Sequence, residues 1–177
     1  PGVNTPDKSI DPFNKTLPSL NGSVGFAWNP TSWNLKTNVG TGFRSGNLAE
    51  LSSDGLHEGT LRYEVGDPDL KIEQNINSEI SINYTSRYFQ FSVAGYLNHF
   101  LNYIYLTPTG TQYLGFDVFR YEQFDANLYG SESMLAVNFP FYERLRFETN
   151  FSIVTGKLSD GTYLPFIPPA KWTQQLQ

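Results

Sequence analysis

Hydrophobic and polar residues alternate along most of this chain with a period of two. Between residues 33 and 43, every second position holds Trp, Leu, Thr, Val or Phe, and the positions between hold Asn, Lys or Gly. A period of two predicts an extended strand with two chemically different faces. Residues 20–28 have the same pattern, and the intervening Asn29-Pro30-Thr31-Ser32 predicts a tight turn, so the two stretches form a hairpin.

Four further stretches alternate in the same way, at 72–84, 89–101, 116–139 and 145–153. Gly130 interrupts the longest of them, which predicts a bulge or kink there. Short turns are expected at 85–87 and 140–143, and long connections at 44–71, 102–115 and about 156–166. The first long connection is expected to contain a short helical turn capped by Asn47. The chain ends at Gln177 within a predicted seventh strand.

The chemistry of the predicted faces indicates a particular kind of sheet. The polar face of 72–84 carries Asn, Ser and Glu, and burying one such group without a partner costs about 1–3 kcal/mol, so this face must contact water. Short turns at one end and long loops at the other are typical of an outer-membrane up-and-down barrel. We therefore predict an all-β fold, an antiparallel up-and-down meander of about seven strands.

Aromatic residues collect at the short-turn end, which predicts a girdle at one membrane interface. They are Trp28, Trp33, Tyr84, Tyr88, Phe89, Phe139, Phe141 and Tyr142. A soluble antiparallel sandwich also has alternating strands, but its strands are usually about 5–6 residues long. The strands predicted here exceed the roughly 9–11 residues that span a bilayer, which favours the barrel.

Composition excludes several classes of protein. The 177 residues include no Cys, which excludes a disulfide scaffold, a thiolate zinc site and a cysteine nucleophile. The net charge of −5, with scattered Lys and Arg, lacks the basic patch of a nucleic-acid-binding protein, so no nucleic acid is expected as a partner. Pro1 is not an initiator Met, and no signal peptide follows it, so the chain is expected to begin inside a longer protein or to be a processed product.

The sequence contains no pattern that predicts catalysis. G-x-S-x-G, H-E-x-x-H and P-loop motifs do not occur, and Gly40-Thr41-Gly42 lacks the spacing of a dinucleotide-binding loop. Asp117 and Asp125 are interpreted as hydrated groups on a lumen face and not as a glycosidase pair. We predict that the protein is not an enzyme and that it requires no cofactor.

One connection carries residue types that bind metals. Residues 44–71 include Asp54, His57 and Glu58, and imidazole with carboxylates can bind zinc or another divalent cation. His99 is predicted near the end of its strand on the same side of the wall, and the two imidazoles would meet if their loops folded over one another. We therefore treat Asp54, His57, Glu58 and His99 as candidate ligand-binding residues, with His57 and Glu58 as candidate metal ligands. A simply hydrated polar loop is the alternative.

Four motifs in this order resemble TonB-dependent outer-membrane receptors. Residues 42–51 look like the family's Phe-Arg-Ala-Pro-x-x-x-Glu-Leu box, with Gly46 in place of the usual Pro, and residues 63–73 are similar to its Asn-Pro-x-Leu-x-x-Glu box, with Asp67 in place of Asn. Residues 125–132 resemble its Ala-x-x-x-Gly-x-Glu element, and residues 164–169 a late-barrel signature. The motif positions are Phe43, Arg44, Asn47, Glu50 and Leu51, then Asp67, Pro68, Leu70 and Glu73, then Gly130 and Glu132.

The resemblance implies a 22-stranded barrel in the outer membrane of a Gram-negative bacterium, closed by a separate plug domain. The implied partners are outer-membrane lipid, the protein's own plug, TonB acting through an N-terminal region, and a small metal-complex ligand. Residues 1–177 would be part of the barrel domain, without the plug, the early strands or the terminal strand.

Within that family, the position of His57 between the first two boxes resembles haem-uptake members, and Gly55-Leu56-His57 resembles zinc-uptake members. A ferric siderophore, haem or zinc is therefore the expected ligand, and ferric siderophores are the most frequent choice in the family. A soluble β-sandwich that binds glycans and a surface barrel without transport are the alternatives.

Overall fold

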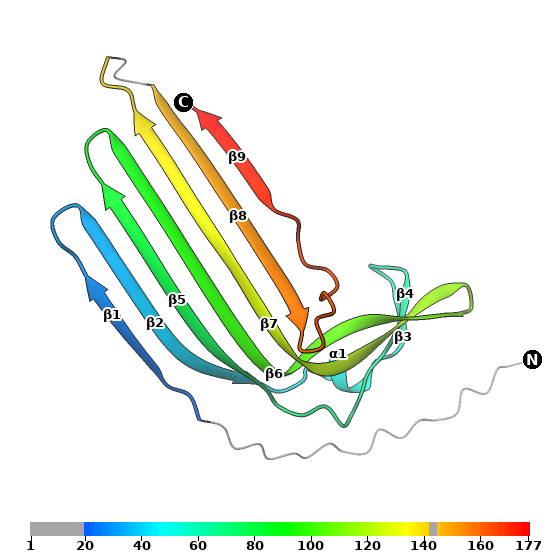
Figure 1. Cartoon of the computed structure of the whole chain (residues 1–177). Helices are drawn as coiled ribbons and strands as arrows, with labels where there is room; N and C mark the ends of the chain where they lie inside the picture. The colour runs from blue at the N-terminus through cyan, green and yellow to red at the C-terminus, as the bar shows by residue number, and fades with distance from the viewer. Residues whose placement is uncertain (1–19, 142–144) are drawn as a thin grey trace, which may run out of the picture.

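A computed structural model describes residues 20–141 and 145–177 as one nine-stranded sheet (Figure 1). Seven strands lie side by side in chain order, each antiparallel to the next. They are β1 (Ser23–Trp28), β2 (Trp33–Arg44), β5 (Glu73–Thr85), β6 (Phe89–Tyr113), β7 (Phe116–Asn138), β8 (Arg146–Leu158) and β9 (Lys171–Leu176). The predicted all-β meander of about seven strands is confirmed.

The long connection between β2 and β5 contains the remaining elements. They are α1 (Leu48–Ser52), β3 (Asp54–His57) and β4 (Arg62–Val65). The last two form a hairpin, and β4 pairs in parallel with β7 between Val118 and Arg120. No helix among the described residues is long and apolar enough to cross a membrane.

The sheet has two different faces, which the antiparallel register continues from strand to strand. Leu35, Ile82, Val93 and Phe151 belong to one row of cross-strand neighbours, and the row also includes Ser133. We call the face of this row the apolar face, and the opposite face the polar face. The polar face carries mainly Asn, Ser, Glu, Lys and Gln.

On the apolar face, large side chains remain exposed because no second layer covers them. Ile80 is 52% exposed and Phe151 40% exposed. On the polar face, neighbouring side chains bond to one another: the Asn77 amide donates to Asn98 Oδ1 at 2.8 Å, and the Ser92 hydroxyl donates to Asn83 Oδ1 at 2.7 Å. A β-sandwich requires two sheets with a core between them, so the single sheet argues against that alternative.

Aromatic side chains gather at the short-turn end of the apolar face, as predicted. The Trp33 and Tyr84 rings lie 4.8 Å apart across β2 and β5, and the Tyr84 and Phe89 rings 6.0 Å apart. The turn before β2 closes with the Trp33 amide donating to the Pro30 carbonyl at 2.9 Å. Part of the turn predicted at 140–143 lies outside the described residues.

Residues 102–115 do not form the long loop that the sequence suggested. Instead, β6 continues to Tyr113, and β7 returns from Phe116. Leu101 and Asn102 together oppose Asp125 in a β-bulge, where Asn102 has a φ of 54° and donates its N–H to the Asp125 carboxylate at 3.0 Å. Asp125 is therefore a structural acceptor and not only a hydrated group.

Beyond this bulge, β6 and β7 bend away from the wall as a two-stranded hairpin (Figure 1). Pro108 is tolerated because this part of β6 has a single ladder neighbour, β7, so the missing N–H faces no third strand. Leu114 and Gly115 both have positive φ, 52° and 83°, as a two-residue type I′ turn requires.

Gly130 does not produce the predicted bulge, because its register with Tyr96 and Val154 is continuous. Its lack of a side chain instead makes room for a neighbouring ring. A Cβ at this position would lie 2.5 Å from the Tyr96 hydroxyl oxygen and 2.4 Å from the Ile153 carbonyl oxygen. The glycine therefore permits the ring of Tyr96 to cover the backbone of β7.

Gly130→Ala is expected to destabilise the sheet by about 1–3 kcal/mol, because the added methyl overlaps a backbone atom that cannot move freely. Gly95→Ala is the matched control, since a Cβ there would have its nearest neighbour at an ordinary 3.9 Å. Urea unfolding of the micelle-bound receptor would measure both variants. Equal stability of the two would contradict this role of Gly130.

Candidate functional site

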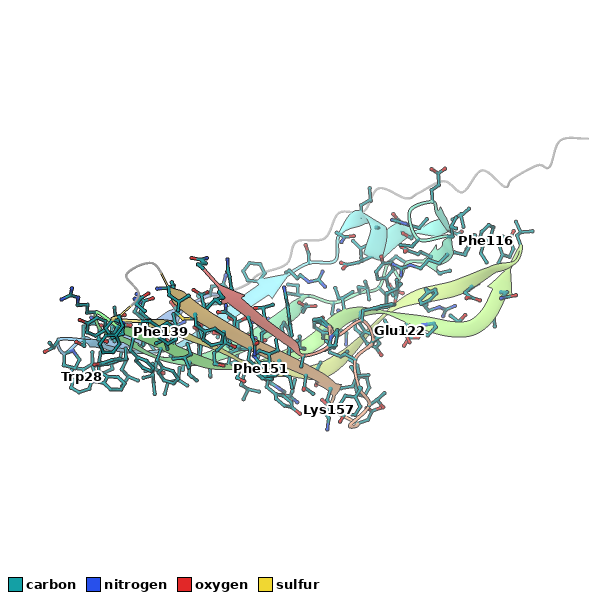
Figure 2. All side chains as sticks on the ribbon, turned by 90° about the horizontal axis from the view of Figure 1, so that it is seen from above. Trp28, Phe116, Glu122, Phe139, Phe151 and Lys157 are labelled. Atoms are coloured by element: carbon teal, nitrogen blue, oxygen red, sulfur yellow. The ribbon has the colours of Figure 1, made fainter. Side chains whose placement is uncertain are left out.

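The segment from α1 to β4 is held against the end of the sheet away from the short turns. In Figure 2 it lies on the side of the sheet opposite to Trp28, which belongs to the apolar face. α1 begins with a reciprocal cap, in which the Glu50 amide donates to Asn47 Oδ1 at 2.9 Å and the Asn47 amide donates to Glu50 Oε2 at 2.8 Å. The helical turn and the cap predicted at Asn47 are confirmed.

Arg44, the last residue of β2, joins this segment to two other strands. Its guanidinium donates to both carboxylate oxygens of Glu73, at 3.0 Å each, and to those of Glu50, at 2.8 and 3.0 Å. Glu73 also accepts the Ile104 amide of β6 at 2.8 Å. We call Arg44, Glu50, Glu73 and the Ile104 backbone the arginine clasp.

The clasp is closed and its carboxylates are largely removed from water. Glu50 is 8% exposed and Glu73 6% exposed. Bidentate arginine–carboxylate pairs are among the stronger charge-assisted hydrogen bonds. One cation therefore bonds to both buried carboxylates, and the three side chains are occupied with one another. The clasp is a structural device and not a vacant ligand site.

The clasp explains why the first two sequence motifs occur together. Arg44 and Glu50 come from the first, and Glu73 from the second. Leu51 and Leu70 pack beside Gly46, where a Cβ would lie 3.3 and 3.5 Å from their side chains. Two further motif positions lie beside the clasp, since the Asp67 amide donates to the Glu50 carbonyl and Pro68 is the next residue. The remaining positions belong to the strands of the sheet, with Phe43 on the apolar face of β2 and Glu132 on β7.

A second contact attaches the segment between β4 and β5 to β7. The side-chain amide of Gln123 accepts the Lys71 N–H at 2.7 Å and donates to the Lys71 carbonyl at 2.8 Å. It donates as well to the Asn102 carbonyl in the bulge, at 3.0 Å. Gln123 thus substitutes for a ladder partner, and sequence reasoning missed it because a glutamine in an alternating strand resembles any polar-face residue.

An aromatic and charged cluster surrounds β4. Arg62 donates to the buried Glu64 at 2.7 Å and lies over the Phe119 ring at 5.2 Å. Glu64 also accepts the Tyr121 hydroxyl at 3.1 Å. Burial raises the pKa of Tyr121, and the hydrogen bond to Glu64 raises it further. Since Arg62 is neutralised by Glu64, this cluster docks β4 to β7 and leaves no unbalanced charge.

The predicted ligand residues lie at the exposed end of the β3–β4 hairpin. His57 ends β3, and its Nδ1 is 3.1 Å from the Thr60 hydroxyl. Glu58 follows it and is exposed. The Tyr63 hydroxyl donates to Asp54 at 2.9 Å. This hydrogen bond is the larger cause of a raised pKa of Tyr63, and burial of the ring is the smaller one. Within residues 20–141 and 145–177 there is no group of three or more His, Asp or Glu side chains able to hold a metal.

The structure does not bring the two imidazoles together. His99 pairs with Asn127 on β7, whereas the β3–β4 hairpin attaches to β7 at Val118–Arg120. These points are about 25 Å apart along the strand. His99 also shares the apolar face with Ile76, its neighbour on β5. His57 and Glu58 remain together on the hairpin, and His99 belongs to a different surface.

Comparison with protein families gives a match over almost the whole chain. Residues 2–175 match the family model described as TonB dependent receptor-like, beta-barrel. The iron-regulated outer membrane virulence protein of Vibrio cholerae is 27% identical over 140 residues, which are 74% of this chain and 21% of that protein.

Solved structures with the same fold include a copper transporter and a siderophore receptor. The copper transporter OprC superposes with a TM-score of 0.73 at 20% identity, covering 88% of this chain and 23% of that one. The siderophore receptor PirA from Pseudomonas aeruginosa gives 0.60 at 19% identity, covering 78% and 28%. The chain thus spans between a fifth and three tenths of the length of these relatives, of which OprC is named a transporter and PirA a siderophore receptor.

Proposed function

The chain belongs to the family of TonB-dependent receptor β-barrels. We propose that its seven antiparallel strands form part of the barrel wall of an outer-membrane receptor, and that its α1–β4 segment forms part of the receptor's extracellular surface. The observation that carries the proposal is the single sheet with exposed Ile and Phe on one face and bonded Asn, Ser and Glu on the other. Such a sheet is stable between hydrocarbon and water. Complete closure would take the 22 strands implied by the resemblance, with a plug domain inside.

The orientation follows from the loops. Short turns with an aromatic girdle face the periplasm in such barrels, and the longer connections face outward. The α1–β4 segment, the β6–β7 hairpin and the connection after β8 would then be outside the cell. The polar face would line the lumen and contact the plug, and TonB would act on the plug from the inner side.

We infer that the cargo is a ferric siderophore, recognised with the help of His57 and Glu58. The relatives named for iron regulation and for siderophore reception support this class of ligand. Both residues stand at the exposed tip of the β3–β4 hairpin, which the arginine clasp and Gln123 fix to the wall. Haem and zinc remain competing ligands because an imidazole can bind either the haem iron or a zinc ion.

Copper is the second candidate, since OprC is a copper transporter. Copper(I) prefers soft sulfur ligands. This chain contains no Cys and one Met, and Met134 lies in the wall on β7. The part of the receptor described here therefore offers nitrogen and oxygen ligands, which fit copper(I) poorly.

The ligand proposal is tested with His57→Ala in the full-length receptor. We expect weaker binding of its ferric siderophore, by roughly tenfold if one charge-assisted contact is lost. His99→Ala is the matched control, because it removes the other histidine from the apolar face and should leave affinity unchanged. Isothermal titration with ferric siderophores, haem, zinc and copper would measure both. Unchanged affinity of His57→Ala for every ligand would refute the assignment.

A further inference from the structure

Lys157 is unusual because of the face on which it lies. It is the next-to-last residue of β8. Across the sheet it pairs with Asn127 of β7, which pairs with His99 of β6, which in turn pairs with Ile76 of β5, so the four residues form one row. Of the described strand positions on the apolar face between the girdle and the bulge, Lys157 is the one occupied by Lys, Arg, Asp or Glu. Figure 2 shows Lys157 and Trp28 on the same side of the sheet, the lower side in that view.

Polar neighbours accompany the lysine. Its ammonium lies over the Tyr163 ring at 4.7 Å, and a backbone bridge joins Lys157 to Tyr163. On the neighbouring strands, His99 Nδ1 is 2.9 Å from Asn127 Oδ1. With that oxygen as acceptor, the Asn127 amide group remains a donor. The row therefore presents an ammonium, an amide and a phenol on a face whose other side chains are uncharged, mostly aliphatic, aromatic, Ser or Thr, over the described strand positions between the girdle and the bulge.

The row lies at the height where a bilayer's hydrocarbon ends. Phe147 belongs to the aromatic end of β8, and Lys157 is ten residues further along the same strand. At about 3.3 Å per residue and a tilt near 40°, these positions are separated by roughly 25 Å along the membrane normal, which is the height of the apolar band of such barrels.

We propose that His99, Asn127, Lys157 and Tyr163 bind the phosphate of an anionic lipid headgroup in the outer leaflet, an inference that rests on the proposed membrane location. The ammonium supplies the charge and the amide and phenol supply hydrogen bonds. Asp160, the carboxylate nearest in sequence, accepts the Thr162 N–H at 2.8 Å and so has a partner of its own. The surroundings of Lys157 complement an anion.

The test compares two lysine variants in the full-length receptor. Lys157→Gln removes the charge on the apolar face, and Lys171→Gln is the matched control because Lys171 begins β9 beside Ser152 on the polar face. Each receptor is reconstituted into vesicles of phosphatidylcholine alone or mixed with phosphatidic acid. Native mass spectrometry then measures how much phosphatidic acid each protein retains, with inorganic phosphate added as a competitor.

We expect the unaltered receptor and Lys171→Gln to retain phosphatidic acid over phosphatidylcholine, and Lys157→Gln to retain roughly fivefold less. Inorganic phosphate should not displace the lipid, because it lacks the chains that place the headgroup at this height. Equal retention by the three proteins, or competition by free phosphate, overturns the lipid site. Failure of the unaltered receptor to insert into either vesicle overturns the proposed function, and this inference with it, whereas insertion without lipid preference overturns the inference alone.

Discussion

Arg44→Met is expected to weaken the attachment of the α1–β4 segment to the wall by about 3 kcal/mol. The substitution leaves the buried carboxylates of Glu50 and Glu73 side by side without the cation that bonds to both, and a buried charge that loses its partner is strongly destabilising. The effect should be local, because the wall strands keep their ladders. Hydrogen exchange of residues 48–72 would show faster opening. The amides of β5 and β6 between the bulge and the short-turn end should change little.

Arg146→Met provides the matched control for the clasp. Arg146 also pairs with a glutamate, Glu148 at 3.1 Å, but both side chains are more exposed than the clasp carboxylates. Exposed pairs contribute at most about 1 kcal/mol. Adding Glu50→Gln and Glu73→Gln to Arg44→Met should restore part of the lost protection, since no uncompensated charge would then remain. If Arg44→Met left exchange unchanged, the clasp would not be what holds this segment.

Ile80→Arg is expected to destabilise the folded receptor in a bilayer by about 2–4 kcal/mol, the cost of a cation facing the middle of the hydrocarbon. Ile80 is 52% exposed in the isolated sheet. In a water-soluble protein, a substitution at so exposed a position would change stability by no more than about 0.5 kcal/mol. Refolding into vesicles, measured by denaturant titration, therefore separates the membrane wall from a soluble module.

Glu79→Arg is the matched control for this substitution. Glu79 is adjacent in the same strand, is exposed and lies on the polar face beside Asn38 and Tyr96. The same new side chain should then contact water and be tolerated. Equal effects of Ile80→Arg and Glu79→Arg would contradict the assignment of the two faces to lipid and water.

The alternation of residue types predicted the strands well because every wall strand contacts two different surroundings. It failed at residues 102–115 for a physical reason. At the bulge, two residues of β6 oppose one of β7, so the alternation changes phase and Tyr103 comes onto the same face as Phe100. A change of phase next to Pro108 and Gly110 resembles a loop in the sequence, although the hydrogen-bonded ladder continues.

The candidate site was predicted only in part. The motifs correctly marked Arg44, Glu50 and Glu73, but their spacing along the chain does not reveal that the three side chains bond to one another. That contact depends on the path of α1 and on the direction of β6 after the bulge. Gln123 gave no signal at all, because its partner is a backbone group of Lys71, and any residue supplies one.

The β6–β7 hairpin also has a practical consequence. Its tip turns through Leu114 and Gly115, and Leu114 is 82% exposed. Because the clasp and the girdle are distant from these two residues, a peptide epitope grafted between them should leave the wall intact. On living bacteria, an antibody against that graft would label the cell exterior and so report directly which end of the sheet faces outward.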